Sequence, residues 1–267
     1  MWHKEYDVDI KTMSDDEIKQ IARDINKHLV VVFRNQSLTP QQELDICAKI
    51  GNVKENKAED TTAKDNLSII KGVMRVTGEL NDRGEPGLFG HEVELDWHTH
   101  HPSGKNRWPF VWLYSERGSK GSRTSWINQV LAYEDLPEDV KQKVNGITVF
   151  CGHKVGSFSP SKIFTDNVGG EPQKIVRTNI EGLTGLYFPF LQIFDIVEGA
   201  TKDEWPDLYD YLKNHILQEK YIMHHDWEDG DLVISEQWLS IHKRWTFADM
   251  KTRVLHRIAL DYEHSYV

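Results

Sequence analysis

The sequence of 267 residues is poor in cysteine and has no long apolar run. Its two cysteines, Cys47 and Cys151, permit one disulfide at most and are typical of a reducing compartment. No apolar run approaches the ~20 residues that a membrane helix requires, and the longest runs, such as residues 29–33, have the length of a strand. Residues 1–5 (MWHKE) contain no apolar signal core. We therefore expect a cytoplasmic protein with no membrane partner.

Basic residues are outnumbered by acidic ones. There are 32 Lys and Arg against 42 Asp and Glu, which gives a formal net charge of −10 at pH 7. This balance argues against a protein that binds duplex nucleic acid, because such a protein usually presents a basic face. The hydrophobic content of 39% is that of a folded globular protein rather than a disordered one. We expect no nucleic-acid partner, and both a monomer and a homo-oligomer are compatible with the composition.

No internal repeat, low-complexity tract or linker divides the chain, so we interpret residues 1–267 as a single domain. Ser14 and Glu17 form a capping-box pattern, and Thr39 followed by Pro40 indicates a second helix that ends before Gly51. A third helical pattern covers 205–217. Strand patterns occur at 29–33, 67–73, 110–115, 147–152, 186–194, 231–234 and 253–262.

These patterns predict a fold that is mainly β with flanking helices, a sandwich or jelly roll. Two long segments, 77–90 and 156–174, lack periodicity and are rich in glycine and proline. Loops of this length in a compact domain often cover a site. We expect both segments to be lids.

Histidine is abundant, with 13 residues, and the densest group lies in the segment from Asp96 to Pro102. His98 and His100 are two residues apart, so in a strand their imidazoles would project from the same face. A third ligand must come from elsewhere in the chain, and His242 is the best candidate. Three protein ligands leave coordination positions open, as a catalytic metal site requires. The alternative is that these are solvated or hydrogen-bonded core histidines.

Arg253 and Arg257 occupy the same side of the last predicted strand, because they are four residues apart. Two guanidinium groups directed into a barrel would need a bound anion, and arginine binds carboxylates in a bidentate manner. The alternative is that both face solvent from an edge strand.

Together these motifs resemble the TauD/TfdA family of Fe(II)- and 2-oxoglutarate-dependent dioxygenases, over residues 30–262. The segment 29–42 is similar to the family's N-terminal strand and helix, and Trp97-His98-Thr99 matches the first three residues of its Trp-His-Thr-Asp metal motif. Residues 121–126 are similar to the Gly-Asp-Thr segment that helps to bind 2-oxoglutarate. Arg253 and Arg257 follow His242 by 11 and 15 residues, which is the family's spacing.

The resemblance implies a double-stranded β-helix fold, with Fe(II) and 2-oxoglutarate as cofactors and with molecular oxygen and a small-molecule substrate as partners. It implies that Thr124 and Arg253 bind the distal carboxylate of 2-oxoglutarate. Arg257 is then expected near the co-substrate or near an anionic substrate. No catalytic residue is expected beyond the metal site.

The sequence departs from the family at His100, where the family has the carboxylate of its facial triad. Without that carboxylate the full divalent charge of the metal remains, which should tighten binding of a dianionic co-substrate. Three outcomes stay open. His100 ligates; or it turns away and leaves a position for a halide, as in the family's halogenases; or iron chemistry is lost and the barrel binds Zn(II), Ni(II) or nothing. Asp96 is the nearest carboxylate that could substitute or support the ligands.

A second departure is the segment 235–238 (SEQW), where relatives usually have Trp-Asp-Asn-Arg. Its effect should fall on the surroundings of His242. Two other classes of function remain, a catalytically silent metal- or 2-oxoglutarate-binding protein and a three-histidine zinc hydrolase or hydratase. Thr124, Arg253 and Arg257 have no purpose in a zinc hydratase, which favours the oxygenase.

Overall fold

Two facing β-sheets form the body of the computed structural model, which describes residues 2–54, 68–80, 84, 87, 89–100, 102, 109–152 and 171–261. The larger sheet has the strand order β1-β2-β15-β7-β17-β5-β4, with β3 paired to β17. Its strands are β1 (Lys4–Tyr6), β2 (Val30–Phe33), β3 (Asn52–Val53), β4 (Ser68–Ile70), β5 (Val73–Thr77), β7 (Phe110–Arg117), β15 (Leu232–Glu236) and β17 (Val254–Asp261). The smaller sheet has the order β14-β8-β16-β6, from β6 (Leu95–His98), β8 (Arg123–Asn128), β14 (Ile222–Asp226) and β16 (Ser240–Arg244).

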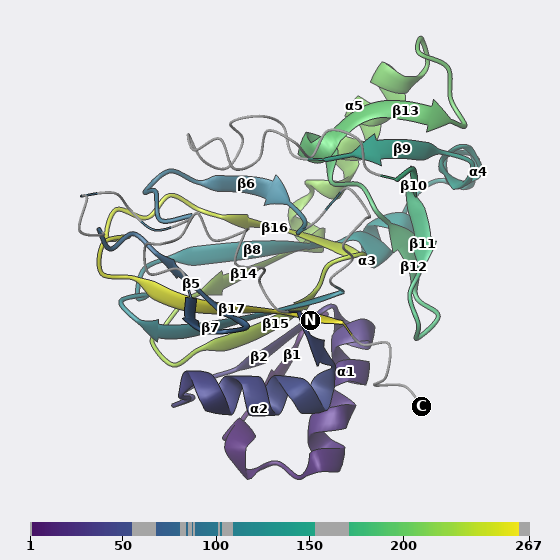
Figure 1. The fold of residues 1–267 in the computed structure, drawn as a ribbon. Helices are drawn as coiled ribbons and strands as arrows, with labels where there is room; N and C mark the ends of the chain where they lie inside the picture. The colour runs from purple at the N-terminus through teal and green to yellow at the C-terminus, as the bar shows by residue number, and fades with distance from the viewer. Residues whose placement is uncertain are drawn as a thin grey trace.

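Figure 1 shows the two sheets stacked as layers, with the helices of the N-terminal segment beneath the larger sheet. The space between the sheets is filled by apolar side chains from both of them, including Val32, Trp126, Trp227 and Leu255. This arrangement is the predicted double-stranded β-helix, or jelly roll. The fold class is therefore confirmed.

The outer face of the larger sheet is covered by α1 (Asp15–His28) and α2 (Pro40–Ile50). Both helices begin with a complete capping box, at Ser14 and at Thr39, in which the cap side chain and the third helical residue satisfy each other's backbone donors. Their apolar faces bury residues such as Ile21 and Cys47 against the sheet. The predicted starts of both helices and the end of α2 at Gly51 are confirmed.

A third unit lies against one end of the smaller sheet, at the upper right of Figure 1. It consists of α3 (Gln129–Glu134), α4 (Glu138–Asn145), α5 (Trp205–Ile216), β9 (Thr148–Cys151), β10 (Gln173–Lys174), β11 (Val176–Thr178), β12 (Thr184–Leu186) and β13 (Ile193–Glu198). Its core joins the barrel through Trp97 and Ile241. The prediction of one strand over 186–194 was wrong. Instead, β12 ends at Leu186, and a short 3-10 helix after Pro189, which has no N–H for a ladder, separates it from β13.

Strands β6, β8, β14 and β16 had no separate sequence prediction, yet they carry much of the site described below.

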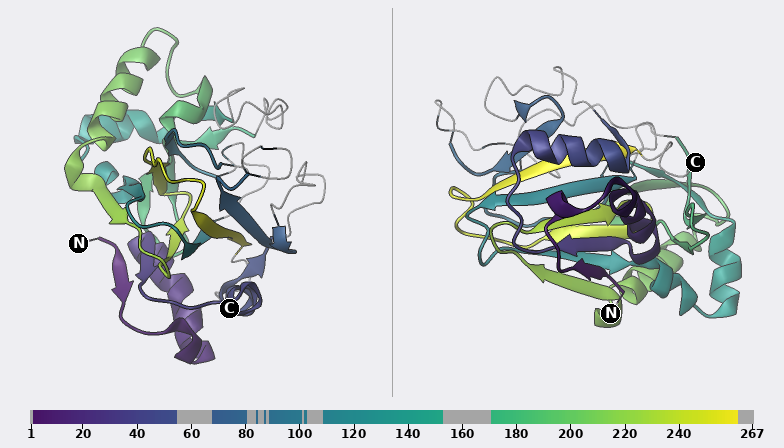
Figure 2. Two further views of the ribbon diagram at one scale, coloured as in Figure 1. Left: turned by 90° about the vertical axis from the view of Figure 1, so that its left-hand side faces the viewer. Right: turned by 90° about the horizontal axis from the view of Figure 1, so that it is seen from below.

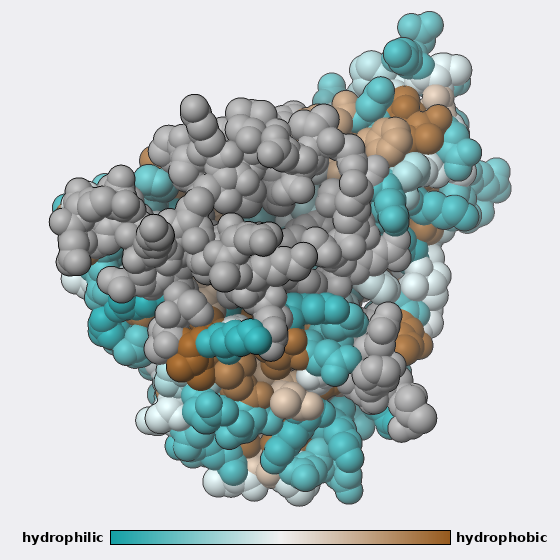
Figure 3. All heavy atoms as spheres, in the orientation of Figure 1, coloured by the Kyte–Doolittle hydropathy of each residue, from teal (hydrophilic) through white to brown (hydrophobic). Residues whose placement is uncertain are grey.

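The two views in Figure 2 show α1 and α2 on one side of the stacked sheets. Figure 3 shows apolar side chains on the surface of the unit that projects at the upper right. Phe194 and Val197 of β13 are among the exposed apolar residues of the described surface. No helix among the described residues is long and apolar enough to cross a bilayer. Most of the predicted lids, residues 81–83, 85–86, 88 and 156–170, lies outside the described residues.

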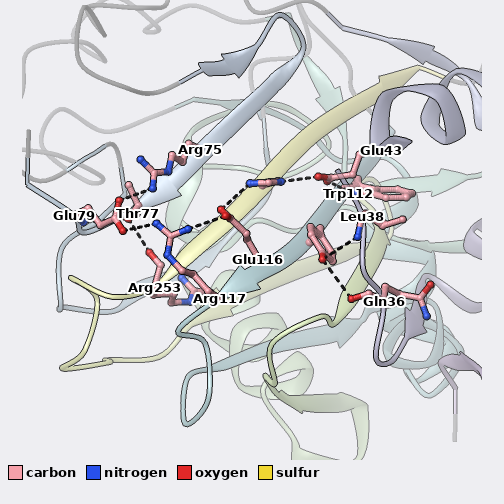
Figure 4. A network of polar contacts seen from close by, with 12 residues as sticks. Gln36, Leu38, Glu43, Arg75, Thr77, Glu79, Trp112, Glu116, Arg117 and Arg253 are labelled. Atoms are coloured by element: carbon pink, nitrogen blue, oxygen red, sulfur yellow. Dashed lines mark hydrogen bonds and ion pairs between the residues drawn. The ribbon is translucent and has the colours of Figure 1, made fainter. Parts of the chain in front are cut away.

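A buried polar network joins α2 to the sheet (Figure 4). His256 of β17 contacts two carboxylates, with Nδ1 2.6 Å from Glu43 Oε1 and Nε2 3.2 Å from Glu116 Oε2. The indole N–H of Trp112 donates to the other oxygen of Glu43 at 2.9 Å. Desolvation raises the pKa of the Glu43 carboxyl, and the neighbouring His256 opposes that rise. The network fixes α2 against β17, the strand that carries Arg257 and that Arg253 directly precedes.

Candidate active site

His98 and His242 lie directly opposite each other in the antiparallel ladder of β6 and β16. Opposite residues of a ladder project from the same face, and here the two ring centroids are 4.2 Å apart. Both side chains are buried, and Trp126, on the other neighbour of β16, stacks against His242 with ring centroids 6.4 Å apart. Two imidazoles are thus brought together by strand pairing between distant parts of the chain.

His100 completes the cluster, but from outside the strand. We expected strand alternation to bring His98 and His100 to one face. This reason was wrong, because β6 ends at His98 and His100 lies outside it. The backbone bends after His98. The centroid of the His100 ring lies 5.7 Å from that of His98 and 4.8 Å from that of His242. One potential ligand nitrogen from each of the three residues lies within 4.8 Å of the other two.

Two glutamine side chains hold the bend that carries His100. Gln192 Oε1 accepts a hydrogen bond from the backbone N–H of Thr99 at 2.8 Å, and Gln192 Nε2 donates to the Thr99 carbonyl at 3.1 Å. The side chain thus makes the two hydrogen bonds that a neighbouring strand would make. Gln237 Oε1 accepts the N–H of His100 at 3.3 Å, and its amide nitrogen donates to Ser235 Oγ at 2.9 Å. Because the ladder has ended, side chains replace the backbone partners of residues 99 and 100.

The electrostatics of the cluster suit a cation. His98 Nδ1 lies 2.6 Å from the carbonyl oxygen of Asp96, which leaves Nε2 as its ligand atom. Burial, with contributions from His98 and Arg257, holds the pKa of His242 well below its usual range, so its imidazole is neutral and can ligate. His242 Nδ1 is buried and makes no hydrogen bond with any described residue. A buried neutral imidazole of this kind fits a borderline divalent metal such as Fe(II) or Zn(II).

Of the two roles suggested for Asp96, substitution for a ligand or support of one, its carboxylate takes neither. The register between β6 and β16 shifts by one between the pairs His98–His242 and Leu95–Arg244, which is a β-bulge at residues 96 and 97. The bulge turns Asp96 outward, where its carboxylate lies 3.4 Å from the Lys243 ammonium. Only the backbone carbonyl of Asp96 supports a histidine.

Arg253 and Thr124 are both buried in the interior of the protein. Arg253 is 1% exposed, and none of its described contacts is to a carboxylate; Nη1 lies 3.9 Å from Met250 Sδ. Burial and the neighbouring Arg244 lower the pKa of its guanidinium to about 9. Thr124 Oγ1 accepts the indole N–H of Trp227 at 2.9 Å. The hydroxyl proton of Thr124 is thus available to another acceptor.

Arg257 of β17 is also buried, with Nη1 3.5 Å from Met74 Sδ. Burial lowers the pKa of Arg257 to about 10. Its charge contributes to the lowered pKa of His242. The expectation that both arginines face inward rather than toward solvent agrees with this burial.

Three residues of the site were missed from the sequence. Gln192 and Gln237 were unremarkable because their roles depend on the fold, although Gln237 lies in the segment 235–238 that departs from the family motif. Arg244 is 5% exposed and could have been found, because in a strand it shares a face with His242 two residues before it. Of the charged residues that flank the histidine motif in sequence, Glu94 forms an ion pair with Lys243, and Lys105 and Arg107 lie outside the described residues.

Comparison with known proteins adds independent evidence. The family model described as "Taurine catabolism dioxygenase TauD, TfdA family" matches residues 1–259. The chain is 23% identical over 243 residues to an alpha-ketoglutarate-dependent 2,4-dichlorophenoxyacetate dioxygenase from Burkholderia sp. (strain RASC), covering 86% of this chain and 81% of that protein. It is 22% identical over 271 residues to pentalenolactone F synthase from Streptomyces avermitilis, covering 92% of this chain and 86% of the relative.

Solved structures show the same fold. The crystal structure of AAD-2 in complex with Mn(II) and N-oxalylglycine has a TM-score of 0.78 at 19% identity and covers 96% of this chain and 92% of its own. A taurine dioxygenase from Burkholderia xenovorans has a TM-score of 0.75 at 22% identity, covering 96% of this chain and 84% of its own. The chain belongs to the TauD/TfdA family of dioxygenases.

Proposed function

We propose that this dioxygenase holds Fe(II) with His98, His100 and His242 and binds 2-oxoglutarate with Thr124, Arg253 and Arg257. The observation that carries the proposal is the convergence of the three imidazoles, with ligand nitrogens within 4.8 Å of one another. A carboxylate ligand would have to come from outside this cluster. The site is therefore a three-histidine variant of the family's metal centre.

When bound, Fe(II) and 2-oxoglutarate supply oxidation of a substrate by molecular oxygen, coupled to decarboxylation of 2-oxoglutarate to succinate and carbon dioxide. The chain itself supplies binding, orientation and a largely dry interior. His98 is oriented by the Asp96 carbonyl, and His242 is kept neutral by burial. The bend at residues 99 and 100 is held by Gln192 and Gln237.

Thr124 and Arg253 would bind the distal carboxylate of the co-substrate. A guanidinium with no carboxylate partner among its described contacts is costly to bury, and an anionic ligand would offset that cost. The Thr124 hydroxyl can donate to the same carboxylate because its oxygen already accepts from Trp227. This pairing of a hydroxyl and a guanidinium would select the co-substrate by its charge.

The substrate is proposed to be a small anionic molecule. Arg257 is a second buried guanidinium close to Arg253 in sequence, and its charge would attract an anionic substrate as well as the co-substrate. One relative is named for 2,4-dichlorophenoxyacetate, a carboxylate, which agrees with this charge. We also propose a cytoplasmic location, because both cysteines are buried free thiols.

The test is succinate formation from 2-oxoglutarate by metal-free protein reconstituted with Fe(II) or with Zn(II), across a panel of small carboxylates and sulfonates. Substrate-dependent succinate with Fe(II) and none with Zn(II) is expected, and His242→Ala serves as the inactive control. Stoichiometric zinc in the purified protein, with no binding of 2-oxoglutarate after exchange to Fe(II), would contradict the proposal.

A further inference from the structure

Arg244 is a buried cation that the family resemblance does not explain. It lies opposite Thr124 in the ladder of β8 and β16, so the two side chains project from the same face. Its guanidinium is 5% exposed and donates to three backbone carbonyls, those of Phe89, His91 (2.6 Å) and Val93. All of these acceptors are neutral backbone groups.

The guanidinium groups of Arg244 and Arg253 meet at one side chain. Met250 Sδ lies 3.7 Å from Nη1 of Arg244 and 3.9 Å from Nη1 of Arg253. The charge of Arg244 is one of the causes of the lowered pKa of Arg253. Within the described part of the chain, neither arginine has a carboxylate at ion-pair distance, and the Nε of each is buried without a hydrogen-bond partner.

Two like charges in a buried region repel each other and each also bears a desolvation cost. An anion bound close to both guanidinium groups, beside Met250, would offset both of these costs, whereas a neutral ligand would offset neither. The Thr124 hydroxyl, on the same face as Arg244, offers a further donor at this place.

We propose that Arg244 is a second guanidinium of the distal-anion subsite, which makes this pocket selective for 2-oxo dicarboxylates over 2-oxo monocarboxylates. The proposal rests on the proposed function, because it assigns a role within the same co-substrate pocket. Arg244 acts through its charge, while its N–H groups remain on the carbonyls of residues 89, 91 and 93. The ligand class is a 2-oxo acid with a second carboxylate at its far end.

A purely structural role for Arg244 is the competing explanation. The three carbonyls belong to the segment that leads into β6 and hence to His98. This segment is tightly packed, since a Cβ at Gly90 would lie 1.9 Å from the Thr77 carbonyl oxygen. Loss of the Arg244 hydrogen bonds would therefore disturb the metal strand and weaken every 2-oxo acid alike.

The experiment compares two ligands of equal chain length, 2-oxoglutarate and 2-oxopentanoate, by calorimetric titration of the Mn(II)-loaded full-length protein. Arg244→Gln keeps donors for the carbonyls and removes the charge, whereas Arg244→Lys keeps the charge with fewer donors. In Arg244→Gln we expect 2-oxoglutarate to bind about 10- to 50-fold more weakly, from the loss of one charge at a separation of several Å. Binding of 2-oxopentanoate should change by less than about threefold, and Arg244→Lys should retain most of the preference.

The inference would be overturned if Arg244→Gln bound both ligands more weakly by the same factor, or if its preference for 2-oxoglutarate were unchanged. Because the readout is a ratio of two affinities in one variant, a general loss of stability or of metal does not imitate the expected result. If Arg244→Gln does not fold, Arg244→Lys decides alone, and loss of its preference for 2-oxoglutarate overturns the inference. A wild-type protein that binds neither 2-oxo acid would instead contradict the proposed function.

Discussion

His98 and His242 form a cross-strand pair in the ladder of β6 and β16, with ring centroids 4.2 Å apart. Strand pairing fixes the distance between two of the candidate ligands before any metal binds. The third, His100, comes from a bend held by side-chain amides. The centre thus has two candidate ligands held by strand pairing and a third whose position depends on hydrogen bonds from the Gln192 and Gln237 side chains.

Substitution of His100 should separate metal binding from co-substrate binding. His100→Ala should weaken Fe(II) binding by about tenfold or more, whereas His100→Asp should retain the metal. The aspartate would lower the positive charge that attracts a dianion, so we expect it to weaken 2-oxoglutarate binding. Anaerobic titrations with Fe(II), then with 2-oxoglutarate, measure both. Wild-type metal affinity in His100→Ala would mean that His100 is no ligand.

The role of Gln192 can be tested by its coupling to His100. Gln192→Met removes both hydrogen bonds to Thr99 at similar volume, and we expect metal affinity to fall about tenfold, the lower end of the range for losses of groups that orient ligands. In a His100→Ala background the same change should have little further effect. Gln173→Met is the matched control, because Gln173 is equally buried but contacts Glu171. Additive losses in the double variant would show that Gln192 acts elsewhere.

Glu236 should make stability depend on pH. Its carboxyl is fully buried, and burial raises its pKa from 4.5 to about 7, although the Leu239 N–H donates to it at 2.6 Å. Between pH 4.5 and 7 the unfolded chain ionises this group while the folded protein keeps it protonated. The unfolded state then binds fewer protons, so stability falls as pH rises through this window.

We therefore expect the difference in unfolding free energy between Glu236→Gln and wild type to increase by about 2–3 kcal/mol, in favour of Glu236→Gln, when the pH rises from 5 to 8. Urea denaturation of both proteins at the two pH values measures the difference. If the difference in unfolding free energy between the two proteins does not change with pH, Glu236 is already ionised in the folded protein below pH 5.

The network at His256 should stabilise the docking of α2. His256→Leu leaves the Glu43 carboxyl buried without its partner, which should cost about 3 kcal/mol or more. Changing both residues, in Glu43→Met/His256→Leu, should cost less than His256→Leu alone, because no buried carboxyl remains. Arg117→Met, at the half-exposed end of the same network, should cost at most about 1 kcal/mol. A double variant less stable than the single one would contradict this view.

The sequence predicted the parts of the fold that depend on local signals. The capping boxes at Ser14 and Thr39 determine helix starts through neighbouring residues, so they could be identified directly. The strand over 186–194 could not be divided correctly, because the apolar run contains no sign of the 3-10 turn after Pro189 except the proline itself.

The candidate site was predicted by residue but not by geometry. Motif spacing singled out His98, His100 and His242, yet the reason that they converge is strand pairing and a bend. The bulge that turns Asp96 outward depends on the register with β16, which no local pattern reveals. Gln192 lies 93 residues from its partner Thr99, so only the folded chain could show the contact.

The most direct measurement is anaerobic addition of Fe(II) to metal-free protein in the presence of 2-oxoglutarate, followed by visible absorption. If three imidazoles hold the metal and the buried arginines hold the co-substrate, a charge-transfer band should grow to one equivalent of Fe(II). The band should be absent in His242→Ala and should require higher 2-oxoglutarate in Arg253→Ala. A wild-type titration without the band, or a band unchanged in His242→Ala, would contradict the account.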